Sequence, residues 1–160
     1  YDVRRKKVLN KKARHNVLFM DGFSQEPDYE DKKGRIVDTK NMPIFTNFRK
    51  NLFHTISETL GFDKINDLIC EGNYYYDNRR CGIGFHGDSE RRKVIALRLG
   101  GSMKMKWRWY HNSEIIGDTF EFEFNGGDLY IMSEKAVGHD WKKRSKYTLR
   151  HAAGCEKYIK

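Results

Sequence analysis

The segment 83–88 reads IGFHGD and places His86 and Asp88 two residues apart. In a β-strand, residues two apart share a face, so both side chains can reach one point. An imidazole and a carboxylate are two of the three ligands in the facial triad that binds iron(II) and leaves positions open for dioxygen. The pair therefore predicts an iron site at the end of a strand. The same spacing also occurs in surface turns, where the aspartate only caps the backbone.

A second set of chemically informative residues is basic and lies near the end of the chain. Arg144 and Arg150 are six residues apart, and we expect them on one face of the last strand. Two guanidinium groups inside a barrel are costly unless they meet a dianion. A dicarboxylate such as 2-oxoglutarate would satisfy them by bidentate pairing. Arg150 is therefore a candidate anchor for a cosubstrate beside the metal.

These side chains need strands to position them, and the pattern after residue 70 predicts strands. Polar and apolar residues alternate in KMKWRW (104–109) and in FEFEF (120–124), which is the period of a half-buried strand. Turn residues separate the runs, as at Gly100-Gly101 and at 126–127. The predicted strands are 71–76, 82–86, 93–99, 103–110, 119–124, 128–132 and 146–150. So many closely spaced strands indicate a small antiparallel barrel or jelly roll.

The first part of the chain supports this core. Residues 43–60 predict a helix, because apolar residues recur at three- and four-residue steps between Pro43 and Gly61. Before it we expect a basic arm (1–15), a short strand (16–20) and a loop (21–33). We therefore expect one domain, 1–160, in which 1–70 are the arm, loop and supporting helix, and 71–160 form the catalytic core.

The order of the motifs resembles that of the AlkB family of nucleic-acid dealkylases. The motifs are N-x-Y at 73–75, I-G-x-H-x-D-x-E-R at 83–91, G-D-L-x-x-M at 127–132 and R-x-x-x-x-x-R at 144–150. The resemblance covers about residues 71–154. It implies a mostly β fold with a flanking helix and a double-stranded β-helix (jelly-roll, cupin-like) core. It also implies an Fe(II)- and 2-oxoglutarate-dependent dioxygenase that uses O2 to demethylate nucleic-acid bases.

The resemblance also implies roles for individual residues. His86 and Asp88 would bind iron, and Glu90 would meet the edge of the damaged base. The cosubstrate would be held by Asn73, Tyr75, Arg144 and Arg150, although a one-residue shift makes Tyr74 and Tyr76 equally possible.

The third iron ligand departs from the family pattern. The family places a histidine two residues past a tryptophan, but here Lys143 stands two past Trp141, and a protonated lysine cannot ligate iron. His139 is the nearest alternative, because it stands eleven residues before Arg150, a spacing common among 2-oxoglutarate oxygenases. His151 follows Arg150 directly and should point to the opposite face. Two hypotheses stay open: His139 is the third ligand, or the protein supplies none.

The charge of the chain bears on its partner. The formal net charge is +9, and several basic clusters lie near aromatic residues. Trp107 and Trp109 share a face between the cations of 104–108, so we expect a platform on which bases of a nucleic acid stack. Two alternatives are that the tryptophans pack in the core and that the charge only keeps the protein solvated.

Composition limits the remaining classes. The chain has 160 residues and no apolar run near the roughly 20 residues that cross a membrane. Its three cysteines are an odd number without a C-x-x-C spacing, which favours reduced thiols in an intracellular (cytoplasmic or nuclear) protein over a zinc cluster. We expect a monomer.

Two other functions remain open. The first is a hydroxylase of a protein or small molecule on the same fold. The second is a nucleic-acid-binding module that kept the barrel and lost its full set of iron ligands, which Lys143 favours.

Overall fold

The computed structural model describes residue 6 and residues 14–28, 30–61, 64–65 and 68–160. Strands predominate, so the prediction of a mostly β protein is confirmed. The sequence predicted one domain with its core from residue 71. By its contacts the chain divides into two compact units, of which one contains His15–Tyr74 and the other Tyr75–Lys160. Most of the basic arm lies outside the described residues.

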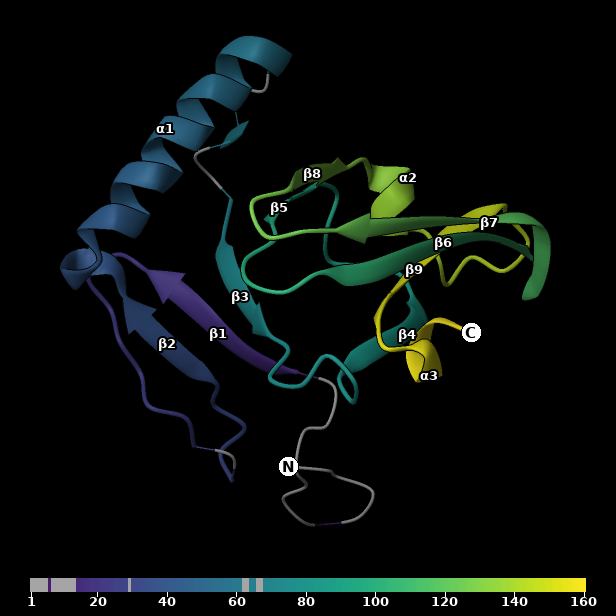
Figure 1. The fold of residues 1–160 in the computed structure, drawn as a ribbon, viewed down its shortest axis with the longest axis horizontal. Helices are drawn as coiled ribbons and strands as arrows, with labels where there is room; N and C mark the ends of the chain where they lie inside the picture. The colour runs from purple at the N-terminus through teal and green to yellow at the C-terminus, as the bar shows by residue number, and fades with distance from the viewer. Residues whose placement is uncertain (1–5, 7–13, 29, 62–63, 66–67) are drawn as a thin grey trace. The chain divides into compact units, whose positions relative to one another are not determined.

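The first unit combines a three-stranded sheet with a long helix (Figure 1). The strand order is β2-β1-β3, with β1 (His15–Met20) parallel to β2 (Arg35–Asp38) and antiparallel to β3 (Cys70–Tyr74). A 3-10 turn, η1 (Thr39–Asn41), leads into α1 (Pro43–Leu60). The predicted helix is confirmed at both ends, because Pro43 starts it and Gly61 stops it in the left-handed conformation.

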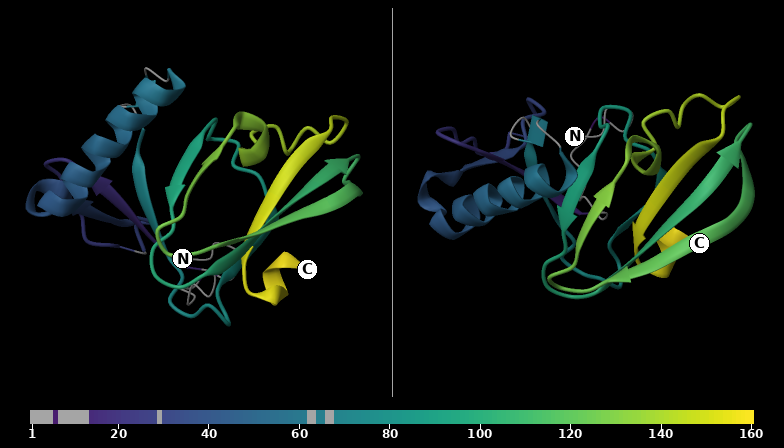
Figure 2. Two further views of the ribbon diagram at one scale, coloured as in Figure 1. Left: turned by 45° about the horizontal axis from the view of Figure 1, so that its top comes forward. Right: turned by 90° about the horizontal axis from the view of Figure 1, so that it is seen from above.

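The second unit consists of two antiparallel sheets. The larger has the order β4-β9-β6-β7, formed by β4 (Gly82–His86), β9 (Thr148–Gly154), β6 (Met103–His111) and β7 (Glu114–Phe124). The smaller pairs β5 (Val94–Leu97) with β8 (Leu129–Met132). Two single-turn helices, α2 (Glu134–Val137) and α3 (Glu156–Ile159), follow β8 and β9. Figure 2 shows the two sheets from two further sides.

The core of this unit lies between its two sheets. Alternate residues of β6, namely Met103, Met105 and Trp107, are buried with Met132 of β8 and Val137 of α2. Because these β6 residues face the smaller sheet, the neighbouring positions on β9 that point the same way also face the interior. Ala153 is one of them. This fixes which side chains of β9 can reach an internal site.

All seven strands predicted after residue 70 exist; the strand 82–86 has the predicted ends, and the other six have shifted ends. β7 begins earlier than predicted, because Glu114 to Ile116 also pair with β6 after a bulge opposite Arg108 and Trp109. β9 begins later than predicted, at Thr148. The sequence did not predict β2, α2 or α3. None of the described helices has the length and apolar character needed to span a membrane.

Candidate metal centre

Two histidines meet where β4 and β9 pair. His86, the last residue of β4, lies directly opposite His151 of β9 in the antiparallel register. Directly opposed residues of an antiparallel pair project to the same face. The two imidazole rings are accordingly 4.4 Å apart between centroids and inclined by 53°. His151 belongs to the set of β9 residues that faces the interior.

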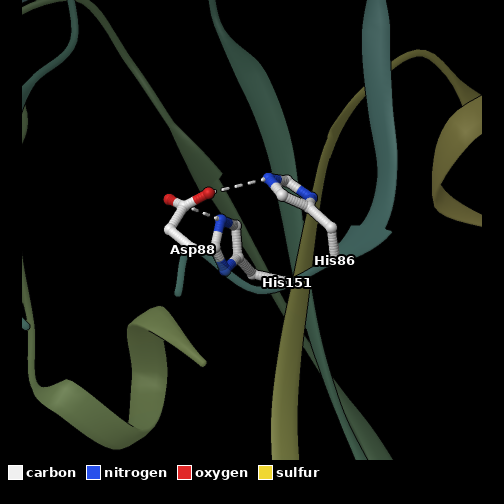
Figure 3. Close-up of side chains that lie close together, drawn as sticks. All are labelled: His86, Asp88 and His151. Atoms are coloured by element: carbon white, nitrogen blue, oxygen red, sulfur yellow. Dashed lines mark ion pairs between the residues drawn. The ribbon is translucent and has the colours of Figure 1, made fainter. Parts of the chain in front are cut away.

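Asp88 completes the group just beyond the end of β4. Its backbone N–H donates to the carbonyl of Val137 at 3.1 Å, which ties this turn to α2. Its carboxylate oxygens lie 3.5 Å from Nε2 of His86 and 3.9 Å from Nε2 of His151 (Figure 3). One ligand atom from each of the three residues lies within 4.8 Å of the other two, and no other such group of three occurs among the described residues.

The hydrogen bonding of His86 suits a ligand. Nδ1 of His86 lies 2.8 Å from the carbonyl oxygen of Gly84. A carbonyl only accepts, so Nδ1 carries the proton and Nε2, the atom that faces Asp88, keeps its lone pair in the neutral ring. Metal-binding histidines commonly use this arrangement, which fixes both the tautomer and the orientation of the ring.

Burial shapes the protonation of the group. Burial, together with the nearby imidazole of His86, lowers the pKa of His151 to about 3, so this ring is neutral near pH 7. Burial also raises the pKa of Asp88, whereas the positive charge of Arg91 acts to lower it. Nη1 of Arg91 lies 3.4 Å from the second carboxylate oxygen of Asp88. A cation held beside Asp88 would therefore share this carboxylate with Arg91.

Gly87, between His86 and Asp88, packs closely against the segment that follows α2. A Cβ on Gly87 would overlap the carbonyl oxygen of Gly138 and lie 2.6 Å from Cβ of Trp141. Only glycine leaves this space free, so its small size lets the H-x-D turn lie against Trp141.

The structure does not include His139 in the group of three. Nδ1 of His139 lies 3.0 Å from the carbonyl oxygen of Arg91, an arrangement like that of His86. The group instead includes His151, which the sequence had placed on the face away from the site. His151 and Arg150 do lie on opposite faces of β9, but the register with β4 turns His151 to the interior.

Arg150 consequently occupies the other face of β9. It pairs with Arg108 across the ladder, and its guanidinium carbon lies 4.0 Å from the ring centroid of Tyr110 and 5.5 Å from that of Trp141. Its Nε is buried without a hydrogen-bond partner. Arg144 is exposed in the turn before β9 rather than on the strand. The structure therefore does not place the two arginines on one strand face.

None of the remaining predicted residues belongs to the group of three, although Trp107 lies opposite His151 in the β6–β9 ladder. Trp107 is 8% exposed, packs in the core and donates from Nε1 to the carbonyl of Ala136, so it offers no open platform for a base. Trp109 is half-buried on the same face of β6. Glu90 is exposed and lies 3.8 Å from Nε of Arg91. Tyr75 packs at the edge of the core.

Asn73 belongs to the first unit, where its carboxamide oxygen accepts a hydrogen bond from Asn16 at 2.6 Å.

Comparison with known proteins gives one curated relative, an uncharacterized protein of Acanthamoeba polyphaga mimivirus. It is 47% identical over 154 residues, which are 96% of this chain and 58% of the viral protein. The chain thus spans less than two thirds of the length of this relative. No family model matches the chain, and no solved structure matches it significantly.

Proposed function

We propose that this chain is an Fe(II)- and 2-oxoglutarate-dependent dioxygenase with a double-stranded β-helix core, and that it dealkylates nucleic-acid bases as the AlkB family does. The observation that carries the proposal is the group formed by His86, Asp88 and His151. Two imidazoles and one carboxylate are the donor set typical of non-haem iron(II) oxygenases.

The donor atoms suit iron(II) in their types and in their surroundings. The bond to the Gly84 carbonyl fixes the orientation of the His86 ring, and burial keeps the His151 ring neutral. The ligand side chains are largely enclosed, with exposed fractions of 22% for His86, 15% for Asp88 and 7% for His151. Bound iron would supply dioxygen activation for the oxidation of a substrate C–H bond, and this enclosure would limit competing reactions with water.

Arg150 supports a dicarboxylate cosubstrate. Within the described part of the chain it forms no ion pair, and its buried Nε has no partner. A carboxylate would satisfy this donor and neutralise the charge. Arg150 lies on the face of β9 opposite to His151, so a cosubstrate would have to reach its guanidinium around Trp141, whose ring lies near that group and whose Cβ packs on Gly87. We assign Arg150, rather than exposed Arg144, as the main cosubstrate anchor.

The test of this function is uncoupled turnover of 2-oxoglutarate. The wild-type chain with Fe(II) and O2 should form succinate, whereas Asp88→Ala should not, because it loses the only carboxylate ligand. Arg150→Ala should raise the Michaelis constant for 2-oxoglutarate roughly tenfold or more, as expected for loss of a buried charge pair. Arg79→Ala, at an exposed arginine in the turn before β4, is the matched control. Equal turnover by wild type and Asp88→Ala would contradict the proposal.

A basic loop next to the metal group supports a nucleic-acid substrate. Lys142, Lys143, Arg144 and Lys146 are all exposed, and none pairs with a described carboxylate. The loop follows Trp141, whose side chain packs on Gly87. At its end, exposed Tyr147 stacks on His111 with ring centroids 4.5 Å apart. Unpaired cations beside an exposed aromatic ring suit a single strand with stackable bases.

The same loop favours a second candidate function, a nucleic-acid-binding module without turnover. The contact between Arg91 and Asp88 also favours it, because this guanidinium already pairs with the carboxylate that a metal would use. Succinate formation separates the two functions, since a binding module would retain oligonucleotide affinity and form no succinate with any metal.

A further inference from the structure

Two cysteines that are far apart in the sequence meet at the end of the β4–β9 ladder. The last paired residues of this ladder are Gly82 and Gly154. One step further in the same register, Cys81 lies opposite Cys155, and the backbone N–H of Cys155 donates to the carbonyl of Cys81 at 3.1 Å. Directly opposed residues of an antiparallel pair have Cα atoms about 4.5 to 5.5 Å apart, which is within the usual range for a disulfide.

The environments of the two thiols differ in a way that suits stepwise oxidation. Both are free thiols; Cys81 is fully buried, whereas Cys155 is partly exposed. Cys155 also lines a surface cavity of about 260 Å³ together with Asn78, Ser102 and Glu156. A small oxidant can therefore reach Cys155, whereas Cys81 is shielded from solvent.

We propose that Cys81 and Cys155 are a modification site that forms an intramolecular disulfide in response to a peroxide. The Cys155 thiolate attacks one peroxide oxygen, which breaks the O–O bond and gives a sulfenic acid and water. The Cys81 thiolate then attacks the sulfur of Cys155, the S–S bond forms, and the hydroxyl leaves as water. In total, two thiols and one hydrogen peroxide give one disulfide and two waters.

The location gives the modification a structural consequence. β4 carries His86 and β9 carries His151, so the disulfide would fasten together the two strands that present the histidines. The inference rests on the cysteines and their register alone, so it stands whether or not the metal group is catalytic.

The experiment treats the chain with hydrogen peroxide, counts the free thiols after denaturation and maps the linked peptides. Of three free thiols, the wild-type chain should retain one, at Cys70, and a peptide linking Cys81 to Cys155 should appear in the monomer and disappear on reduction. Cys70→Ser is the matched control and should form the same link. Cys155→Ser should form no intramolecular link.

Three results would overturn the inference. Both thiols could persist under peroxide, Cys155 could oxidise further to a sulfinic acid while Cys81 stays free, or the link could include Cys70 or join two chains. Because the main measurement uses the wild-type chain, a variant that folds poorly does not leave the question open.

Discussion

His151 is the most buried member of the candidate metal group formed with His86 and Asp88, and its surroundings decide its protonation. The ring is enclosed between β4, β9 and the α2 segment, beside the imidazole of His86. A charged imidazolium there would lose its hydration and lie against a second histidine, so the neutral form is favoured. A neutral, buried imidazole is ready to donate its lone pair to a cation without first losing a proton.

This burial predicts acid sensitivity of the metal-free protein. The pKa of His151 falls from 6.5 to about 3 on folding, so the unfolded chain binds a proton there that the folded chain does not. The free energy of unfolding should therefore decrease as the pH falls below 6.5, by roughly 2 kcal/mol at about pH 5, or about 4 to 8 °C in melting temperature.

Melting curves of wild type and His151→Gln between pH 7 and 5, recorded with a chelator, check this effect. The wild-type melting temperature should fall more steeply. Asp88 acts in the opposite sense, because its raised pKa makes the folded chain bind the extra proton, and its contribution largely cancels in the comparison of the two proteins. Parallel curves would show that His151 does not titrate differently on folding.

Single residues were predictable where the chemistry is local. His86 and Asp88 are two apart on a strand end, and their proximity follows from strand geometry alone. His151 lies 65 residues after His86, and the pairing register of β4 with β9 brings the two together. Neither the alternation of residues along a strand nor their spacing in the sequence determines that register. The sequence could place Arg150 and His151 on opposite faces but could not say which face was internal.

At the scale of elements, the helix 43–60 and the strand 82–86 were predicted to the residue, because Pro43, Gly61 and the motif itself mark their ends. β2 and the one-turn helices were not, since four residues carry too little periodic signal. The β7 extension depends on a bulge opposite Arg108 and Trp109, which pattern alone does not reveal. The pairing of β4 with β9 is the element contact on which the metal group rests.

The tight packing of the H-x-D turn gives a prediction for Gly87→Ala. The added methyl group would overlap the carbonyl of Gly138 and crowd Trp141, so the turn must move away from α2. We expect a loss of about 1 to 3 kcal/mol in stability and weaker Mn(II) binding, because Asp88 is displaced.

Thermal melts and Mn(II) titrations of Gly87→Ala and Gly84→Ala make this measurement. Gly84→Ala, three residues earlier on β4, is the matched control, because a methyl group there meets nothing closer than 3.7 Å. Similar stability and Mn(II) affinity in the two variants would mean that the H-x-D turn does not depend on close packing.

At the scale of the whole molecule, the net charge is +9, but only some of the cations are free to bind a polyanion. Lys104 and Lys106 both pair with Glu121, at 3.1 and 2.9 Å, so the strand first expected to bind nucleic acid is largely neutralised. The loop from Lys142 to Lys146 keeps its charges unpaired. Sequence clusters showed where cations are dense, but only the folded chain shows which of them already have partners.

Salt dependence of oligonucleotide binding tests this difference. Replacing Lys142, Lys143, Arg144 and Lys146 with glutamine should reduce the log–log salt slope for a short single strand by roughly 2 to 3, since each phosphate contact contributes about 0.7. Replacing Lys104 and Lys106 should change the slope by much less. If the second change flattened the slope as much as the first, the basic loop would not be the binding surface.

The central claim is that His86, Asp88 and His151 hold one metal ion, and calorimetric titration with Mn(II) tests it most directly. The wild-type chain should bind one equivalent. Single alanine variants of these three residues should each bind more than about 100-fold more weakly, since loss of a ligand should exceed the 10- to 100-fold effect of an outer-shell change. His139→Ala should keep nearly full affinity. Loss of binding in His139→Ala with normal affinity in His151→Ala would contradict the account and assign the third ligand to His139.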